Sequence, residues 1–141
     1  MVAAGKSRRK RCSWADGDAL MALYHDREWV VPQRDGLMLW EMLMLEGCAK
    51  IEATIRGAQI YCDMGSRGET FSDYCWSFTA GQAVRNNGRT RIVSSPLSER
   101  VSKDLKKRGF KFVGPTIVYA WMQAIGIVDD HSSACFRRKR C

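Results

Sequence analysis

The residues best suited to chemistry are the two histidines and two of the six cysteines, which form pairs near opposite ends of the chain. Cys12 precedes His25 by thirteen residues, and Cys135 follows His131 by four. A spacing of four places both side chains on one face of a helical turn. Thiolate and imidazole suit tetrahedral Zn²⁺, and four protein ligands leave no position open for a substrate. The spacing predicts a structural zinc site, and its alternative is four unrelated side chains.

The six cysteines show no spacing typical of a disulfide framework. They occupy positions 12, 48, 62, 75, 135 and 141 of the 141 residues. The N-terminal sequence MVAAGKSRRKR has no apolar stretch behind its charges, so no secretory signal is expected. No apolar run approaches the roughly 18 residues of a membrane helix. We therefore expect reduced thiols, no membrane contact and a cytoplasmic location, associated with the nucleoid in a prokaryote.

One carboxylate, Glu46, follows a run of Leu and Met at the expected end of a helix. The helix dipole disfavours a negative charge there, so either Glu46 accepts hydrogen bonds from a bound group or binds a cation, or it is a solvated acid at a frayed end. Trp14, Tyr24 and Trp29 lie near the candidate metal ligands in the sequence. Aromatic faces beside a carboxylate suit a flat, electron-poor ring. The alternative for each ring is ordinary core packing.

The elements that must position these residues are all expected to be helical. Asp18, Asp35 and Pro96 mark three helix starts, through two N-caps and a first-turn proline. Residues 80–95 are polar and rich in Gly and Asn, as in a surface loop. No run of alternating strand residues occurs, so we predict an all-α fold. The expected helices cover 16–24, 36–47, 50–64, 70–78 (helix or turn), 96–108 and 116–125.

Apolar spacing predicts which face of each helix is buried. The helix at 36–47 is apolar nearly all round, as a central core helix would be. In the other helices, apolar residues recur at spacings of three and four. The positions expected to face inward are Leu20, Leu23 and Tyr24; Ile51, Ile55, Ala58 and Tyr61; and Leu97, Val101 and Leu105.

The net charge of +8 is carried by the chain ends. Residues 1–11 and 136–141 hold nine of the 23 basic residues and no acid, which leaves 14 basic and 15 acidic residues between them. We therefore expect one domain over 12–135 between two disordered basic tails, which can add non-specific affinity for phosphates. A further basic group surrounds an expected helix end and is either a DNA-backbone contact or a solvated face. It consists of Lys106, Lys107, Arg108 and Lys111.

Several segments together resemble one family, DNA-3-methyladenine glycosylase I of the helix-hairpin-helix glycosylase superfamily. The resemblance covers about residues 11–135 and is strongest in the C-terminal half. It is carried by Cys12-Ser13-Trp14, Tyr24-His25-Asp26 with Glu28-Trp29, Leu45-Glu46-Gly47, Trp76-Ser77-Phe78, SKDLKKRGFKFVG at 102–114, Tyr119, Met122-Gln123-Ala124, Gly126, and Asp130-His131 with Cys135.

The resemblance implies a compact helical glycosylase in which zinc joins the N- and C-terminal segments. It implies that the metal ligands are Cys12, His25, His131 and Cys135. It implies that Glu46 is the catalytic, base-recognising acid and that Trp14 and Tyr24 bind the base. The implied reaction is hydrolysis of the N-glycosidic bond of N3-methyladenine in alkylated double-stranded DNA, by a protein expected to be a monomer.

The chain departs from this family between Glu46 and Lys50. There the family continues through further helices, a pocket tryptophan and the helix-hairpin-helix loop, and this chain lacks a long internal segment. We expect apolar surface to be uncovered on the helix 37–45. Val30 also stands where the family has Gly, and is strained if that site needs a positive φ. Besides an active glycosylase, two alternatives are a non-catalytic zinc-closed DNA-binding or relic domain and a shortened product that folds poorly.

Overall fold

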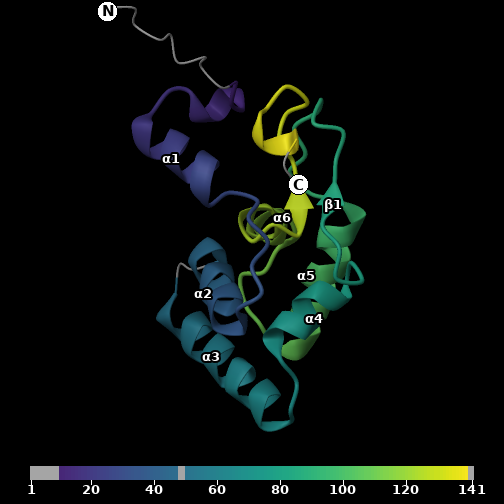
Figure 1. Cartoon of the computed structure of the whole chain (residues 1–141). Helices are drawn as coiled ribbons and strands as arrows, with labels where there is room; N and C mark the ends of the chain where they lie inside the picture. The colour runs from purple at the N-terminus through teal and green to yellow at the C-terminus, as the bar shows by residue number, and fades with distance from the viewer. Residues whose placement is uncertain (1–9, 48–49, 140–141) are drawn as a thin grey trace, which may run out of the picture.

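The structure is a computed structural model, and it describes residues 10–47 and 50–139. Within these ranges the chain is mostly helical (Figure 1). The elements are a short 3₁₀ helix at Ser13–Ala15, α1 (Ala19–Arg27), α2 (Gly36–Gly47), α3 (Ile51–Ser66), α4 (Phe71–Ser77), β1 (Val84–Arg85), α5 (Pro96–Arg108), α6 (Pro115–Ala124), β2 (Val128–Asp129) and a second 3₁₀ helix at Arg137–Lys139.

Helix α6 lies at the centre of the fold. It packs against α2 on one side and α5 on the other, and α4 also packs against α2. Its Trp121 is buried, and the indole Nε1 donates a hydrogen bond to the carbonyl of Leu39 in α2, at 3.1 Å. Val101 and Leu105 of α5 face this core as predicted, and Leu97 packs against its edge. This arrangement fixes α6 as a rigid wall for the site described below.

The predicted helix-capping residues are confirmed. The Asp18 carboxylate accepts hydrogen bonds from the backbone N–H groups of Leu20 and Met21, and Asp35 accepts one from Met38 at 2.7 Å. Ser95 begins α5 with a capping box, and Pro96 occupies the first turn. Such caps satisfy N–H groups that have no partner inside the helix.

Two predictions about secondary structure were wrong in detail. The first helix begins at Ala19 rather than residue 16 and continues to Arg27, so that it includes His25. The loop at 80–95 contains β1, which pairs in parallel with β2 in the register Val84 to Val128 and Arg85 to Asp129. This two-residue bridge joins the loop to the C-terminal segment, and it is the one departure from an all-α fold among the described residues.

The inward faces predicted for two helices were also wrong. Leu20 and Leu23 of α1 are exposed, Leu20 by 76%, whereas His25 is the buried residue of that helix. In α3, Ile51 is 80% exposed and Ile55 is also exposed. The buried stripe of α3 runs instead through Ala53, Gly57, Ile60 and Met64. Apolar spacing shows which residues share a face of a helix, but that face is buried only where another segment packs on it. No described segment packs on these residues of α1 and α3.

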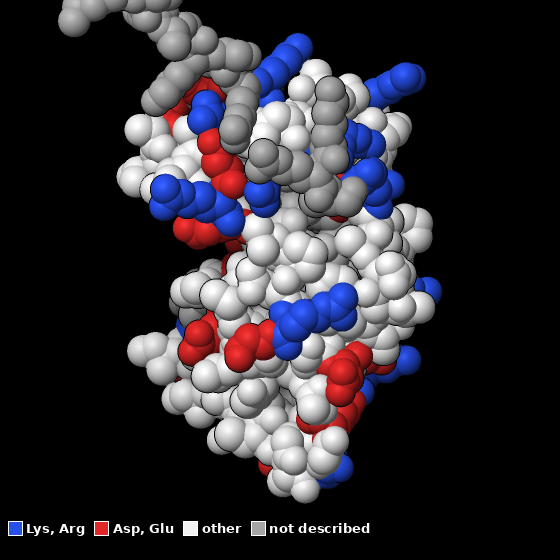
Figure 2. Space-filling view, viewed as in Figure 1, with Lys and Arg blue, Asp and Glu red and all other residues white. Residues whose placement is uncertain are grey.

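Helix α2 confirms the expectation of uncovered apolar surface. Leu39 and Leu43 are buried, but Leu37 and Met38 are exposed and Leu45 is 79% exposed. Helix α3 lies beside α2, and uncharged side chains cover much of the lower left edge in Figure 2, where both helices lie. The junction at residues 48–49, where the missing segment was inferred, lies outside the described residues.

The chain ends differ in part from the expected disordered tails. Residues 1–9 and 140–141 lie outside the described residues. Arg11, however, belongs to the fold, because its guanidinium binds Asp26. Arg137–Lys139 forms a 3₁₀ helix, and Arg138 donates hydrogen bonds to the carbonyls of His131 and Asn86. None of the helices in the described ranges is both long and apolar enough to cross a membrane.

Candidate functional site

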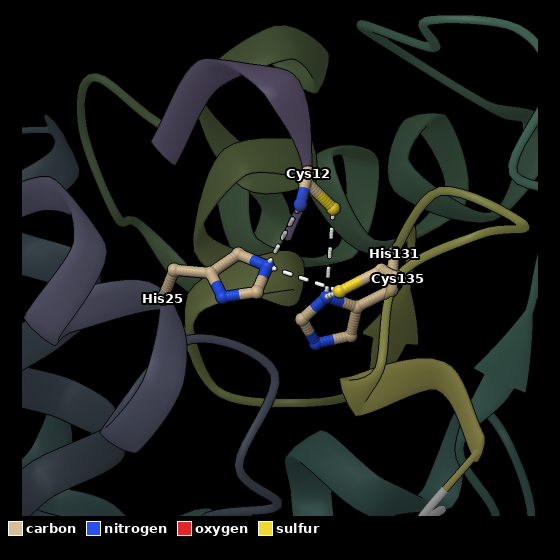
Figure 3. A group of neighbouring side chains, drawn as sticks. All are labelled: Cys12, His25, His131 and Cys135. Atoms are coloured by element: carbon tan, nitrogen blue, oxygen red, sulfur yellow. Dashed lines mark hydrogen bonds between the residues drawn. The ribbon is translucent and has the colours of Figure 1, made fainter. Parts of the chain in front are cut away.

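The four residues proposed as metal ligands meet in the interior (Figure 3). Their ligand atoms all lie within 4.8 Å of one another, and all four residues are buried. The sulfur of Cys135 lies 3.3 Å from His25 Nε2 and 3.5 Å from His131 Nδ1, and the sulfur of Cys12 lies 3.7 Å from His131 Nδ1. Neither cysteine forms a disulfide. The predicted convergence of the two pairs is therefore confirmed.

Segments from both ends of the chain deliver these ligands. Cys12 immediately precedes the first 3₁₀ helix, and His25 lies in the last turns of α1. His131 and Cys135 lie in a turn after β2, where the Cys135 N–H donates to the carbonyl of Ser132 at 2.9 Å. A helical turn was expected here and was wrong, but the turn still aims both side chains at the same point. The Ser132 N–H also donates to the Cys12 sulfur, at 3.2 Å.

A carboxylate outside the ligand set orients His25. Asp26 accepts a hydrogen bond from His25 Nδ1 at 2.9 Å and hydrogen bonds from Arg11 Nε and Nη2 at 2.8 and 2.7 Å. A carboxylate only accepts, so Nδ1 carries the proton and Nε2 presents a lone pair to the cluster. The Arg11 guanidinium is the main reason that the pKa of Asp26 is lowered to about 2.

The second histidine is also suited to bind a cation. Burial lowers the pKa of His131 to about 4, which keeps the ring neutral at physiological pH. Burial likewise raises the pKa of the Cys135 thiol. The His131 Nε2 atom is buried and has no hydrogen-bond partner among the described residues. Two thiols and two imidazoles that meet in a buried cluster fit a borderline-soft divalent ion such as Zn²⁺.

A small hydrophobic cluster surrounds the four ligands and is separate from the main core. It contains Trp29 and Val30, with Tyr24 and Phe136 packed at its edge. The Trp29 ring stacks on His25 with centroids 5.9 Å apart and meets His131 edge-on at 4.6 Å. Val30 has a φ of 59°, so the condition under which strain was expected is met, and this conformation is unfavourable for a β-branched residue.

A cavity of about 550 Å³ adjoins this cluster. The rings of Trp14, Tyr24 and Trp29 line it, and Trp14 is 40% exposed. The rest of the wall comes from the loop at Thr90–Val93, from one face of α6 and from Asp130. The α6 residues in this wall are Thr116, Tyr119, Ala120 and Gln123. The predicted aromatic group thus lines a cavity large enough for a purine, although Trp29 is mainly engaged by the histidines.

Glu46 lies beside this cavity but not in its wall. Its side chain is exposed, and it is not among the residues that line the cavity. Its charge nevertheless contributes to raising the pKa of Tyr24, although burial is the larger cause. Partial removal of water from the Glu46 carboxylate also raises its own pKa above the usual value. The acid is therefore close to one aromatic ring of the cavity and reachable from solvent.

Asp130 is the carboxylate that does line the cavity. Its Oδ2 atom accepts hydrogen bonds from Tyr119 Oη at 2.6 Å and from Gln123 Nε2 at 2.7 Å. Its Oδ1 atom accepts one from Asn86 Nδ2 at 2.5 Å, and the same amide donates to Tyr119 Oη at 2.9 Å. Burial is the main cause that raises the pKa of Tyr119, the Asp130 carboxylate raises it further, and the hydrogen bond from Asn86 acts in the opposite direction.

The basic group at the end of α5 is not uniform. Lys106, Lys107 and Lys111 are exposed. Arg108 instead binds Glu69 at 2.7 Å and Asp104 at 3.3 Å, and its guanidinium lies 4.0 Å from the Tyr74 ring centroid. Arg108 is therefore engaged within the protein, which disfavours it as a phosphate contact. On the face seen in Figure 2, Lys and Arg gather in the upper part, where the segments nearest the two chain ends lie.

Comparison with known proteins identifies the family to which this fold belongs. The family described as methyladenine glycosylase matches residues 14–49 and 48–138. The chain belongs to the methyladenine glycosylase family. DNA-3-methyladenine glycosylase 1 of Escherichia coli (strain K12) is 34% identical over 178 residues, which cover 89% of this chain and 95% of that protein. DNA-3-methyladenine glycosylase of Haemophilus influenzae (strain ATCC 51907 / DSM 11121 / KW20 / Rd) is 31% identical, with 89% and 96% covered.

A solved structure agrees with these relatives. A crystal structure of 3-methyladenine DNA glycosylase I superposes with a TM-score of 0.83 at 34% identity and covers 90% of this chain and 98% of that one. The alignment with the Escherichia coli protein is longer than the 141 residues of this chain, so that methyladenine glycosylase has residues without a counterpart here. The two matched segments meet at residues 48–49, which supports the inferred internal gap.

Sequence reasoning missed the residues that support the site. Asp26 directly follows a metal ligand and formed part of the family resemblance, yet its bond to His25 depends on Arg11, fifteen residues earlier. Tyr119, Gln123 and Asp130 were likewise only fragments of that resemblance. Their signal in the sequence is the i, i+4 spacing of Tyr119 and Gln123, which places both on the cavity face of α6.

Proposed function

We propose that this chain is a DNA-3-methyladenine glycosylase that hydrolyses the N-glycosidic bond of N3-methyladenine in alkylated double-stranded DNA. It acts as a monomer in the cytoplasm. The observation that carries this proposal is the aromatic cavity beside the buried Cys and His cluster, in a member of a family whose named relatives are such glycosylases.

The reaction needs little acid catalysis. N3-methyladenine in DNA is cationic, so the bond between C1′ and N9 is already weakened. When it breaks, its electron pair goes to N9 and neutralises the base, while water adds to C1′ and releases a proton to solvent. The chain has to hold the base outside the duplex, between Trp14 and Tyr24. Glu46 is the proposed acceptor of hydrogen bonds from the edge of the base.

The proposed cofactor is one structural Zn²⁺ ion. Cys12 Sγ, His25 Nε2, His131 Nδ1 and Cys135 Sγ would hold it, and with four protein ligands it would not take part in the hydrolysis. Its contribution would be to join the two ends of the chain in a reducing compartment. Trp14 follows Cys12 by two residues and Tyr24 precedes His25, so the ligands also position the aromatic wall.

Contacts to the DNA backbone are proposed for Lys106, Lys107 and Lys111. Their exposure leaves the ammonium groups available to phosphates. The absent internal segment favours a second candidate function, a zinc-closed domain that binds DNA without excising bases. The observation that supports this second function is the uncovered apolar surface on α2 and α3. The relatives are longer and have additional residues that this chain lacks.

The decisive experiment measures N3-methyladenine released from alkylated DNA by the zinc-containing chain. Glu46→Gln is the test variant, and Glu41→Gln, an exposed acid on the same helix, is its control. Release by the wild type and by Glu41→Gln that falls in Glu46→Gln would support the proposal. No release by a folded chain with one zinc would favour the binding domain. A chain that contains no zinc and gives no near-UV circular dichroism signal would instead show that the shortened product folds poorly.

A further inference from the structure

We propose that Asp130 is the counter-ion of the cavity, and that it selects a cationic, flat ring over a neutral ring of the same shape. This inference rests on the proposed function, because it concerns the same cavity. It assigns the charge selectivity to a residue of the cavity wall rather than to Glu46, which is exposed and lies outside that wall.

The first reason is that Asp130 has no cationic partner within the described part of the chain. Asp26 is paired with Arg11, and Asp129 with Arg85 at 3.1 Å. The donors to Asp130 that the structure describes are all neutral, the Tyr119 hydroxyl and the amides of Asn86 and Gln123. No Lys, Arg or His among residues 10–47 and 50–139 forms an ion pair with it. Its negative charge is therefore held in place without being neutralised.

The second reason is the nature of the surrounding wall. Asp130 is half-buried and shares the cavity with the rings of Trp14, Tyr24 and Trp29. The one Lys or Arg in the described wall is Arg91, which is exposed to solvent and forms no ion pair with Asp130. The face of an aromatic ring is electron-rich, so it attracts a cation and does nothing to offset a carboxylate. A half-buried carboxylate also interacts more strongly with a charge than an exposed one does, because less water screens it.

The third reason is that the carboxylate is held in a fixed position. Tyr119 and Gln123 belong to α6, which packs between α2 and α5, and Asn86 follows β1. The three donors hold both carboxylate oxygens before any ligand arrives. A group positioned in advance loses little conformational entropy on binding. Tyr119, Gln123 and Asn86 are thus positioning residues for Asp130.

The test compares two small probes that differ in charge. The cation is 3,9-dimethyladeninium, in which a methyl group replaces the deoxyribose, and the neutral probe is 9-methyladenine. Their binding to the zinc-containing full chain is followed by quenching of tryptophan fluorescence. We expect the wild type to bind the cation at least ~10-fold more tightly, a free-energy difference of about 1.4 kcal/mol. Asp130→Asn should reduce this ratio to less than ~3-fold while changing the affinity for 9-methyladenine little.

Glu46→Gln provides the matched variant, and it remains informative if Asp130→Asn fails to fold beside His131. Both probes carry the amino group of adenine, so loss of Glu46 should weaken both and keep most of the ratio. The proposal is overturned if the wild type shows no preference, if folded Asp130→Asn keeps it, or if Glu46→Gln abolishes it. Base release from DNA is a separate measurement, so failure of the proposed function would leave this result independent.

Discussion

At the scale of single residues, Asp26 orients one ligand of the candidate metal centre without belonging to the ligand set. Its carboxylate fixes the proton of His25 on Nδ1, and Arg11 holds that carboxylate from the far side. Such partners of ligating histidines typically affect metal affinity 10- to 100-fold. The two residues connect the N-terminal segment to α1, next to the ligands Cys12 and His25.

Replacement of Asp26 by Asn should therefore weaken metal binding. The amide can present an N–H group to His25 and cannot form the ion pair with Arg11. We expect zinc affinity, measured by competition with a chromophoric chelator, to fall about 10- to 100-fold. Asp16→Asn, an exposed acid near the same segment, should leave it unchanged. Equal affinities for the two variants would contradict the role given to Asp26.

Val30 combines two effects of opposite sign. Its φ of 59° strains a β-branched residue by about 1 to 2 kcal/mol, but its side chain is only 2% exposed and its burial stabilises the fold by a similar amount. Val30→Gly should change the free energy of unfolding by less than ~1 kcal/mol. Val113→Gly removes an equally buried side chain without a positive φ and should cost more than ~2 kcal/mol. Similar losses in denaturant titrations of both variants would show that Val30 is not strained.

At the scale of elements, Arg108 and Lys107 at the end of α5 have different roles. Arg108 joins α5 to Glu69, before α4, and to Tyr74 within it, whereas Lys107 is exposed. Arg108→Gln should lower stability by about 1 to 2 kcal/mol, measured by thermal unfolding. Lys107→Gln should leave stability unchanged and reduce the salt dependence of DNA binding by about one phosphate contact. The reverse pattern would make Arg108 the DNA contact.

The sequence was sufficient to predict where the helices are capped, but it was insufficient to predict which helix faces are buried. Caps such as Asp35 and Ser95 act through neighbouring backbone groups, so local sequence determines them. Ile51 and Ile55 would be buried only if a segment distant in the sequence packed on them, and both are exposed. The apolar spacing of α3 does not show whether such a segment is present. The metal ligands were predictable because few side chains bind soft ions. The Asp130 contacts were not, since they join Asn86, Tyr119 and Gln123 across the fold.

At the scale of the whole molecule, the uncovered face of α2 and α3 should tolerate polar residues. Leu45 and Ile51 are 79% and 80% exposed, so Leu45→Gln with Ile51→Gln should change stability by less than ~1 kcal/mol. The same double variant should bind less of a hydrophobic dye, because it removes apolar surface. Ile60→Ala on the buried side of α3 should cost about 2 to 5 kcal/mol. A large loss from the double variant would mean that this face is covered in solution.

The joining of the two chain ends should also be sensitive to acid. His131 has a pKa of about 4 in the fold against an ordinary 6.5, so its stabilising contribution is complete above pH 6.5 and is lost as pH falls towards 4. A bound metal competes with protons in the same direction, because a ligating imidazole must be deprotonated. The stability that Asp26 contributes is lost at lower pH, as the pH falls below its ordinary pKa of 3.8 towards its pKa of about 2 in the fold. Thermal unfolding between pH 7 and pH 4.5 checks this window, and constant stability across it would contradict the assignment.

The proposed metal centre would tie Trp14 and Tyr24 to the C-terminal segment, so the cavity would depend on it. X-ray absorption at the zinc K edge of the purified, reduced chain tests this centre most directly. We predict one zinc per chain with two sulfur neighbours at about 2.3 Å and two nitrogen neighbours at about 2.0 Å. A shell dominated by oxygen, or a folded chain that contains no zinc, would contradict it.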